Sequence, residues 1–127
     1  MIYTGTQINT SATFAFKAAE AIEDPRNKAI VVTADGAKVA TGGTAPIMGV
    51  ALITNDFPVN AGEDVHVQIK EIGLVEAGGE VAVGDALTAN AEGKAVKATE
   101  GAYVLGIAMA PGVAGDKIAV QIVKYKG

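Results

Sequence analysis

The feature that most constrains the fold of this chain is an internal repeat. Residues 34–52 (ADGAKVATGGTAPIMGVAL) align without a gap with residues 91–109 (AEGKAVKATEGAYVLGIAM). Within this alignment Gly36 falls on Gly93 and Gly49 on Gly106, and apolar positions fall on apolar positions throughout. A second block, 61–69 (AGEDVHVQI), matches 114–122 (AGDKIAVQI) after a short deletion in the preceding loop. The chain is therefore predicted to contain two copies of one unit.

The two copies cover about residues 13–70 and 66–124 and overlap at a shared segment. A unit repeated this regularly is typical of an architecture in which one copy cannot bury its apolar face alone and packs against the next. We therefore predict a single β domain over residues 13–127. Residues 1–12 are polar and carry few apolar anchors, and they are predicted to form an extended N-terminal arm.

The apolar residues are of the kinds that favour strands. The 127 residues include 24 Ala, 15 Val and 11 Ile but only 4 Leu, and 16 Gly interrupt the apolar runs. β-branched side chains sit well on a pleated, half-buried surface, and frequent glycine is typical of many tight turns. Short apolar runs between turns predict an all-β fold, a small barrel or sandwich built from two duplicated β units.

Each copy predicts the same series of elements. Strands are expected at 29–33, 38–41, 46–53 and 65–71 in the first copy, and at 86–89, 95–98, 103–110 and 118–125 in the second. Residues 73–84 are expected to form a loop and strand that connect the copies. At most one short helix is expected, over residues 17–23, because alanine and glutamate are good helix formers and Pro25 ends the segment.

Four glycines recur at equivalent places in the two copies. Gly36 and Gly93 follow an acidic residue in predicted hairpin turns, where glycine supplies positive φ. Gly49 and Gly106 interrupt the longer apolar strands, where glycine marks a bend, a bulge or a close approach of backbones. Their recurrence predicts a repeated kink of the kind that a closing barrel needs.

Charge and composition argue against several classes of protein. A net charge of −4 disfavours a nucleic-acid partner, which requires a high density of cations. No apolar run approaches the ~20 residues that span a bilayer, so no membrane partner is expected. The N-terminal residues have neither a basic region nor an apolar region typical of a secretory signal. The absence of cysteine excludes disulfides and thiol chemistry.

Catalytic chemistry is sparse in the sequence. His66 is the only imidazole, and Ala119 takes its place in the second copy, so we interpret it as a solvated or subunit-contact side chain. A set of polar residues offers oxygen ligands for Ca²⁺, but it lacks the spacing of a known site and favours a polar turn: Asn55, Asp56, Asn60, Glu63 and Asp64. Ser11, the only serine, lies in the predicted arm. We predict no catalytic residue, no metal site and no cofactor, and hence no enzyme.

The repeated blocks also carry a family resemblance. The segments GVAL (49–52), AGGEVAVGDALT (77–88), VLGIAM (104–109) and AGDKIAVQI (114–122) resemble the small capsid decoration, or cement, proteins of tailed bacteriophages. The resemblance runs from Ile47 to the C-terminus. It implies a structural protein, made in the host cytoplasm, that binds the outer capsid surface of the virion and bridges subunits of the major capsid protein. It also implies a homotrimer without enzymatic activity.

The predicted arm fits such a role, because an extended polar segment can add a strand to the edge of a partner's sheet. Contacts with the capsid or with another subunit are predicted for residues of the arm, with Tyr3 as the anchor: Ile2, Tyr3, Thr4, Gln7 and Ile8. Two alternatives stay open. One is a barrel-sandwich carrier or other small binding module, with a modified lysine at the hairpin tip 90–94 (NAEGK). The other is an enzyme or a ligand-binding barrel, for which the sequence offers no convergent polar set.

Overall fold

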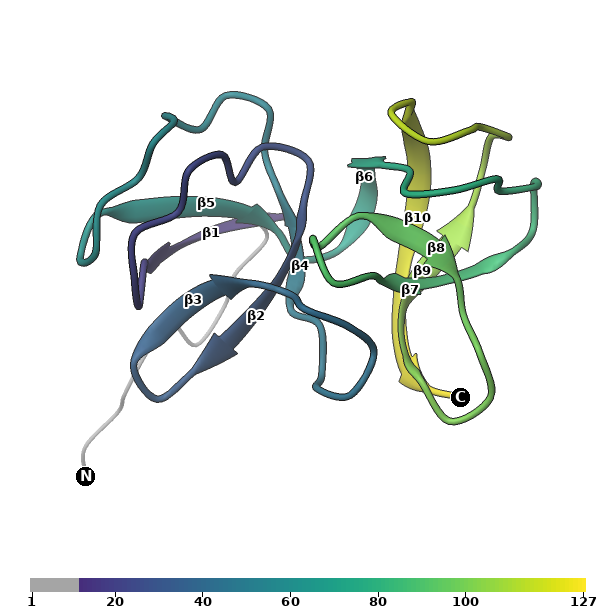
Figure 1. The fold of residues 1–127 in the computed structure, drawn as a ribbon, viewed down its shortest axis with the longest axis horizontal. Coiled ribbons are helices and arrows are strands. Elements are labelled where there is room, and N and C mark those ends of the chain that lie inside the picture. The colour runs from purple at the N-terminus through teal and green to yellow at the C-terminus, as the bar shows by residue number, and fades with distance from the viewer. Residues whose placement is uncertain (1–11) are drawn as a thin grey trace.

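The fold consists of two five-stranded antiparallel sheets that lie side by side (Figure 1). It comes from a computed structural model that describes residues 12–127, and this part of the chain contains no helix. The first sheet holds β1 (Thr13–Lys17), β2 (Ala29–Thr33), β3 (Gly36–Val39), β4 (Gly49–Ala51) and β5 (Asp64–Gln68). The second holds β6 (Glu71–Glu76), β7 (Ala86–Ala89), β8 (Ala95–Lys97), β9 (Tyr103–Ala108) and β10 (Lys117–Lys126). The prediction of an all-β fold is confirmed.

The two sheets have the same strand order. The first runs β1-β5-β4-β2-β3 and the second runs β6-β10-β9-β7-β8, so each strand has a counterpart in the other sheet. Each sheet curls until its edges approach at one parallel bridge, between Ala18 and Ala37 in the first and between Ala77 and Ala95 in the second. The sheets remain open beyond these bridges. Of the two architectures expected, this pair of open sheets is consistent with a small sandwich and not with a closed barrel.

The helix expected over residues 17–23 is wrong. Ala18 is buried and bridges Ala37, and Ile22 exchanges two backbone hydrogen bonds of 2.8 Å with Val59. Intrinsic helix preferences amount to fractions of a kcal/mol per residue, so backbone pairing and burial override them. The alanines serve here to let two edges of a curled sheet come close together.

The strand after residue 64 also differs from the expectation. β5 ends at Gln68 instead of continuing to residue 71, and Glu71 adopts a φ of 69°. This residue redirects the chain into β6, so the expected connector is an edge strand of the second sheet. The strand expected at 46–53 is likewise shorter, because β4 covers only Gly49–Ala51.

The buried apolar residues form two clusters, and one of them belongs to both sheets. The smaller cluster lies within the first sheet around Ile30, Val65 and Val67. The larger one surrounds Leu87 and Leu105 of the second sheet, and it includes four residues from the first half of the chain: Ala29, Ala40, Ile47 and Val50. The two sheets therefore share a core.

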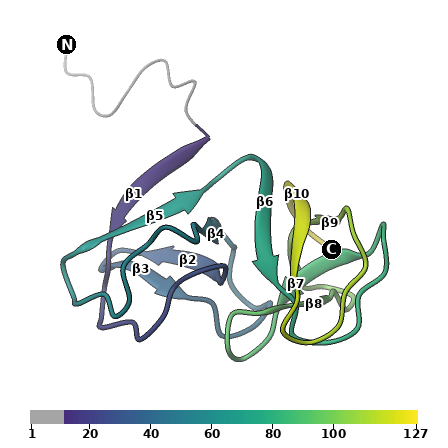
Figure 2. The same ribbon diagram turned by 90° about the horizontal axis from the view of Figure 1, so that it is seen from above.

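Asn27 holds the junction between the sheets. It is buried, with a φ of 60°, and its N–H donates to the carbonyl of Ala51 at 2.9 Å. Its side-chain amide donates to the carbonyl of Leu74 at 3.0 Å, and its own carbonyl accepts the N–H of Glu76 at 2.9 Å. One residue of the first half thus pairs with the edge of β6, the strand that lies between the sheets in Figure 2. Residues 12–127 include no helix long and apolar enough to cross a membrane.

Candidate interaction surface

The polar residues considered for a cation lie together, but their oxygens serve the loop itself. They line a hollow of about 290 Å³ beside His66. The Asn55 side chain donates to the carbonyls of Leu52 and His66 at 2.8 and 2.9 Å, and its oxygen accepts the His66 N–H at 2.8 Å. The Glu63 carboxylate accepts the N–H of Asn60 at 2.7 Å. In residues 12–127 no group of three or more His, Asp or Glu side chains is placed to hold a metal ion.

Asp64, the remaining acid of this set, pairs with Lys17 on the neighbouring strand. The amine lies 2.7 Å from the carboxylate, and both side chains are exposed. The hydrogen bond and charge of Lys17 lower the pKa of Asp64. An exposed pair of this kind contributes little stability, and it gives no acid–base function to the loop.

Glu76, at the end of β6, lies among three lysines at the junction of the sheets. Its side chain is only 13% exposed, and its oxygens lie 3.2 Å from Lys28, 3.2 Å from Lys94 and 3.5 Å from Lys117. Burial raises the pKa of Glu76, but the hydrogen bonds and charges of these lysines outweigh it, so that the pKa lies below its ordinary value. The cluster joins Lys28 of the first half to the second sheet.

The hairpin tip at 90–94 packs against the first sheet. The Asn90 side chain accepts the N–H groups of Glu92 and Lys94 at 2.9 and 3.0 Å, and the carbonyl of Gly93 accepts the N–H of Ala29 at 2.7 Å. Gly93 has a φ of 76°, and a Cβ at this position would collide with the Val39 side chain. Since the Lys94 amine pairs with Glu76 and Glu92, the tip does not present a free lysine as a carrier domain requires.

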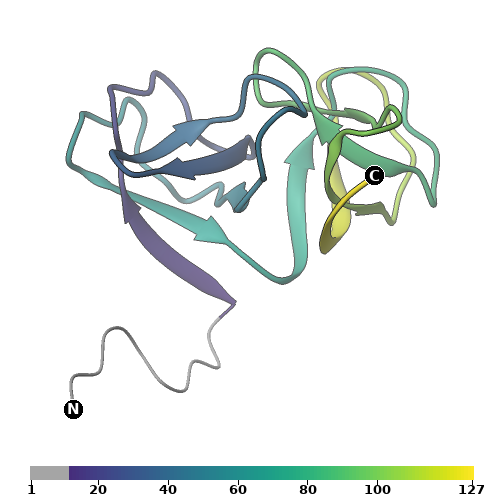
Figure 3. The same cartoon turned by 90° about the horizontal axis from the view of Figure 1, so that it is seen from below.

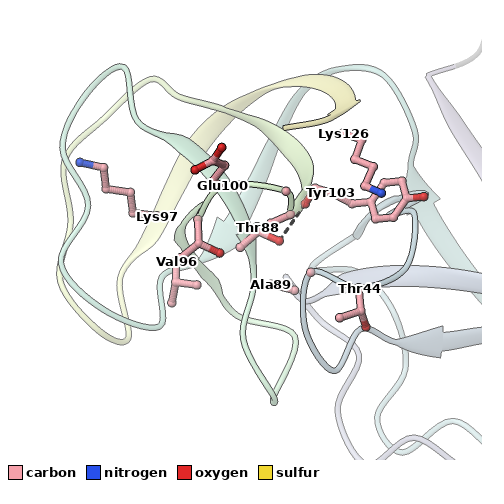
Figure 4. Close-up of a pocket in the computed structure, with 12 residues that line it drawn as sticks. Thr44, Thr88, Ala89, Val96, Lys97, Glu100, Tyr103 and Lys126 are labelled. Atoms are coloured by element: carbon pink, nitrogen blue, oxygen red, sulfur yellow. Dashed lines mark hydrogen bonds between the residues drawn. The ribbon is translucent and has the colours of Figure 1, made fainter.

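A cavity of about 510 Å³ lies where the β3–β4 loop meets the β8–β9 loop (Figure 4). The carbonyl of Gly43 accepts the N–H of Tyr103 at 2.9 Å and joins the two loops. The Thr88 hydroxyl donates to the carbonyl of Tyr103 at 2.8 Å, and the Lys126 amine lies 5.4 Å from the centre of the Tyr103 ring. Its polar side chains are thus engaged with each other, and the described residues place no nucleophile beside a base in it.

The most exposed large apolar side chains lie on two loops of the second half. Val83 is 63% exposed and Val113 is 59% exposed. Their loops are joined by two backbone hydrogen bonds between Val81 and Gly112, of 2.9 and 3.0 Å, and lie side by side at the upper right of Figure 1. We call Val83 and Val113 the apolar tip. Because a contiguous exposed apolar patch marks a contact site, the tip is a candidate interaction surface.

The equivalent loops of the first half are polar. They are joined by the corresponding bridge between Ile22 and Val59, and the positions that match Val83 and Val113 hold Asp24 and Asn60. The Asp24 carboxylate forms two hydrogen bonds of 2.9 Å with the Arg26 side chain, and these hold the pKa of Asp24 at about 2. The Arg26 guanidinium in turn lies 3.7 Å from the centre of the Phe57 ring. The sequence analysis missed the apolar tip because these loops differ in length between the copies and were not aligned.

A second exposed apolar surface is a groove of about 240 Å³ between the sheets. One wall carries Leu52 and Ile53, which follow β4, and the other carries Ile72 and Leu74 of β6. Ile53 and Ile72 are each 55% exposed and Leu74 is 47% exposed. We call it the inter-sheet groove.

The repeated glycines allow close contacts. At Gly49 a Cβ would collide with the carbonyl oxygen of Gln68, and at Gly106 with that of Gln121, the matching residue of the second sheet. Both have close backbone approach in common, which is one of the reasons expected for glycine within a strand. Gly36 has a φ of 127° and lies against the carbonyl of Lys17.

The residues predicted to contact the capsid or another subunit lie outside the residues that the structure describes. These are Ile2, Tyr3, Thr4, Gln7 and Ile8, and Ser11 lies outside them as well.

Comparison with known proteins gives a similar fold without a family. No protein-family model matches the chain, and no curated protein matches it. Among solved structures, it is similar to the crystal structure of the head fiber gp8.5 N base in bacteriophage phi29, with a TM-score of 0.65 and 24% sequence identity. The match covers 91% of this chain and 96% of the phage protein chain. The likeness shows that the two chains share a fold over nearly their whole lengths.

Proposed function

We propose that this chain is a non-enzymatic structural protein of a bacteriophage head, which attaches to the outer capsid surface as a decoration protein. The observation that carries the proposal is the fold shared with the phi29 head fiber N base, which extends over 96% of that chain. The resemblance of the repeated blocks to phage decoration proteins supports it from the sequence. In this role the chain stabilises the shell by bridging subunits of the major capsid protein.

The physical character of the molecule supports such a role. The sheets share a core and are joined by Asn27 and by the lysines around Glu76, so the chain is a stiff body. The apolar tip offers a small contact surface on one end of that body. Small contacts bind tightly when several are engaged at once, because each further contact forms at high effective concentration.

The direct test uses heads of the phage that encodes this chain, prepared without it. Purified protein is mixed with these heads and the mixture is sedimented through a density gradient. We expect saturable co-sedimentation and a higher temperature for head disruption. Absence of the protein from purified virions, together with no binding to the bare heads, would contradict the proposal.

A pair of variants tests the apolar tip as the contact surface. V83D/V113D places charges at the tip and is expected to weaken head binding by at least about tenfold, since desolvating an unpaired charge at a contact is costly. V123D introduces the same change at an exposed valine of β10 and serves as the matched control. Equal binding by the two variants would remove the tip from the proposal.

We propose a homotrimer as the form that binds the head, as the resemblance to decoration proteins implies. Sedimentation equilibrium is then expected to give three times the chain mass of 12.8 kDa. A mass of one or two chains, both in solution and after release from heads, would contradict the trimer while leaving head attachment in place.

A further inference from the structure

We propose that the N-terminal segment, residues 1–10, binds in the inter-sheet groove of its own chain and closes it as a strap. The proposal does not depend on attachment to a phage head. It rests on the chemistry of the groove, on the place where the segment joins the described fold, and on the reach of ten residues.

The groove is apolar where an exposed surface of a sheet is usually polar. Its floor holds Val50 and Ala51, which are buried, and its rims hold the half-exposed Ile53, Ile72 and Leu74. An antiparallel sheet with one face in water normally alternates apolar and polar residues, and β6 alternates instead between buried and exposed apolar positions. Each exposed aliphatic side chain gains about 1.5–3 kcal/mol on full burial, so covering the groove is favourable.

The polar groups at the groove are already engaged. The Asn27 side chain donates to the carbonyl of Leu74, and the Gln68 side chain donates to the carbonyl of Lys70 at 2.8 Å. The occupant must therefore be held mainly by apolar side chains. The N-terminal segment supplies three large ones: Ile2, Tyr3 and Ile8.

The segment joins the fold at the edge of the groove. The carbonyl of Ala12 accepts the N–H of Ile69 at 2.8 Å, and Thr13 pairs with Gln68, which lines the groove. Because β1 is antiparallel to β5, the chain that precedes Ala12 continues in the direction in which β5 runs, toward the start of β6. Figures 2 and 3 both show the beginning of β1 beside the turn from β5 to β6.

The reach of the segment is sufficient. Ten extended residues span up to ~33 Å, whereas six residues of a strand such as β6 span ~20 Å. A short tether holds its own segment near the groove at roughly millimolar effective concentration, which exceeds the concentration of a second copy in dilute solution. This favours the segment of the same chain over that of a neighbour.

Cysteine cross-linking tests the proposal, because the native chain contains no cysteine and every disulfide must then come from the introduced pair. In Y3C/I53C the second cysteine lies on the groove wall. In the matched control Y3C/F57C it lies at a similarly exposed residue, 56% against 55%, which follows β4 in the same loop but does not line the groove. In a glutathione buffer we expect the intrachain disulfide of Y3C/I53C to form at least about tenfold faster than that of Y3C/F57C. Equal rates, or a disulfide-linked dimer as the main product, would overturn the proposal.

A second measurement on the full chain needs no disulfide. Y3A/I8A removes two apolar side chains of the segment, and T4A/Q7A changes two polar ones as the control. Amide NMR signals of Ile53, Ile72 and Leu74 are expected to shift in Y3A/I8A and to stay nearly unchanged in T4A/Q7A, while Val83 is unaffected in both. If Y3A/I8A leaves the groove signals in place, the segment does not bind there. Neither readout involves heads, so its failure leaves the proposed function standing.

Discussion

At the scale of single residues, the fold depends on positions where a side chain has no room. Gly49 and Gly106 lie in matching strands of the two sheets, and each lies against the backbone carbonyl of a glutamine on the neighbouring strand. A backbone carbonyl in a paired strand cannot move aside without disturbing the hydrogen bonds of that strand. These two contacts set how closely β4 approaches β5 and β9 approaches β10.

We expect G49A and G106A to destabilise the protein by about 1–3 kcal/mol each, the range for overpacking a close contact. G79A is the matched control, because a Cβ at Gly79 meets nothing within 4 Å. The free energy of unfolding is measured by urea titration. A loss in G49A no larger than that in G79A would show that the strands can separate without cost.

Asn27 combines two roles, and two substitutions separate them. N27G keeps a residue that tolerates positive φ but removes the hydrogen bond to Leu74, whereas N27A removes the bond and strains the backbone as well. We expect a loss of about 1–3 kcal/mol for N27G, because the carbonyl of Leu74 loses its partner, and a larger loss for N27A. Equal stability of N27A and the native chain in thermal unfolding would contradict both roles.

At the scale of elements, the lysines around Glu76 tie the end of β6 to the first half of the chain. The pKa of Glu76 is lower in the folded protein than its ordinary value of 4.5. The ionised cluster therefore stabilises the fold above pH 4.5, and this contribution is lost as the pH falls through the lowered pKa.

E76Q is expected to lower the stability at pH 7 by about 1–3 kcal/mol, since three lysines then lack their anion. It should also flatten the loss of stability that the native protein shows between pH 5 and pH 3, a window of roughly one unit on either side of the ordinary pKa. Urea midpoints at several pH values measure both effects. E80Q alters an exposed glutamate and is the control. A native pH dependence in E76Q would assign the acid sensitivity to other groups.

The elements also show what the sequence can predict. Period-two alternation and β-branched residues were sufficient to locate β2, β7 and β10 to within about two residues, the usual uncertainty of element ends. The segment at 17–23 could not be predicted, because its alanines fit a helix locally and are drawn into a sheet only by partners such as Ala37. Nothing at Glu71 signals a positive φ, so the turn into β6, and with it the inter-sheet groove, was beyond a reading of local pattern.

At the scale of the whole molecule, the two halves have matching strand orders but do not have separate interiors. Ala29, Ala40, Ile47 and Val50 come from the first half and are buried in the cluster around Leu87 and Leu105. Polarity also differs between matching places, with Asp24 and Asn60 opposite Val83 and Val113. A common fold with different exposed surfaces is what a head-attached protein needs if one end contacts a partner and the other faces solvent.

The shared core predicts that neither half folds alone. Separating the chain at residue 70 would expose the four apolar residues that the first half places in the larger cluster, and would also remove Asn27 from β6 and Lys28 from Glu76. We expect the full chain to unfold in one transition, with circular dichroism and tyrosine fluorescence giving the same midpoint. Fragments 1–70 and 71–127, prepared separately, should show no cooperative unfolding, and mixing them should restore it in part. Two separate transitions in the full chain, or a cooperative transition in fragment 71–127, would mean that each sheet is stable without the other and that the repeat consists of two domains.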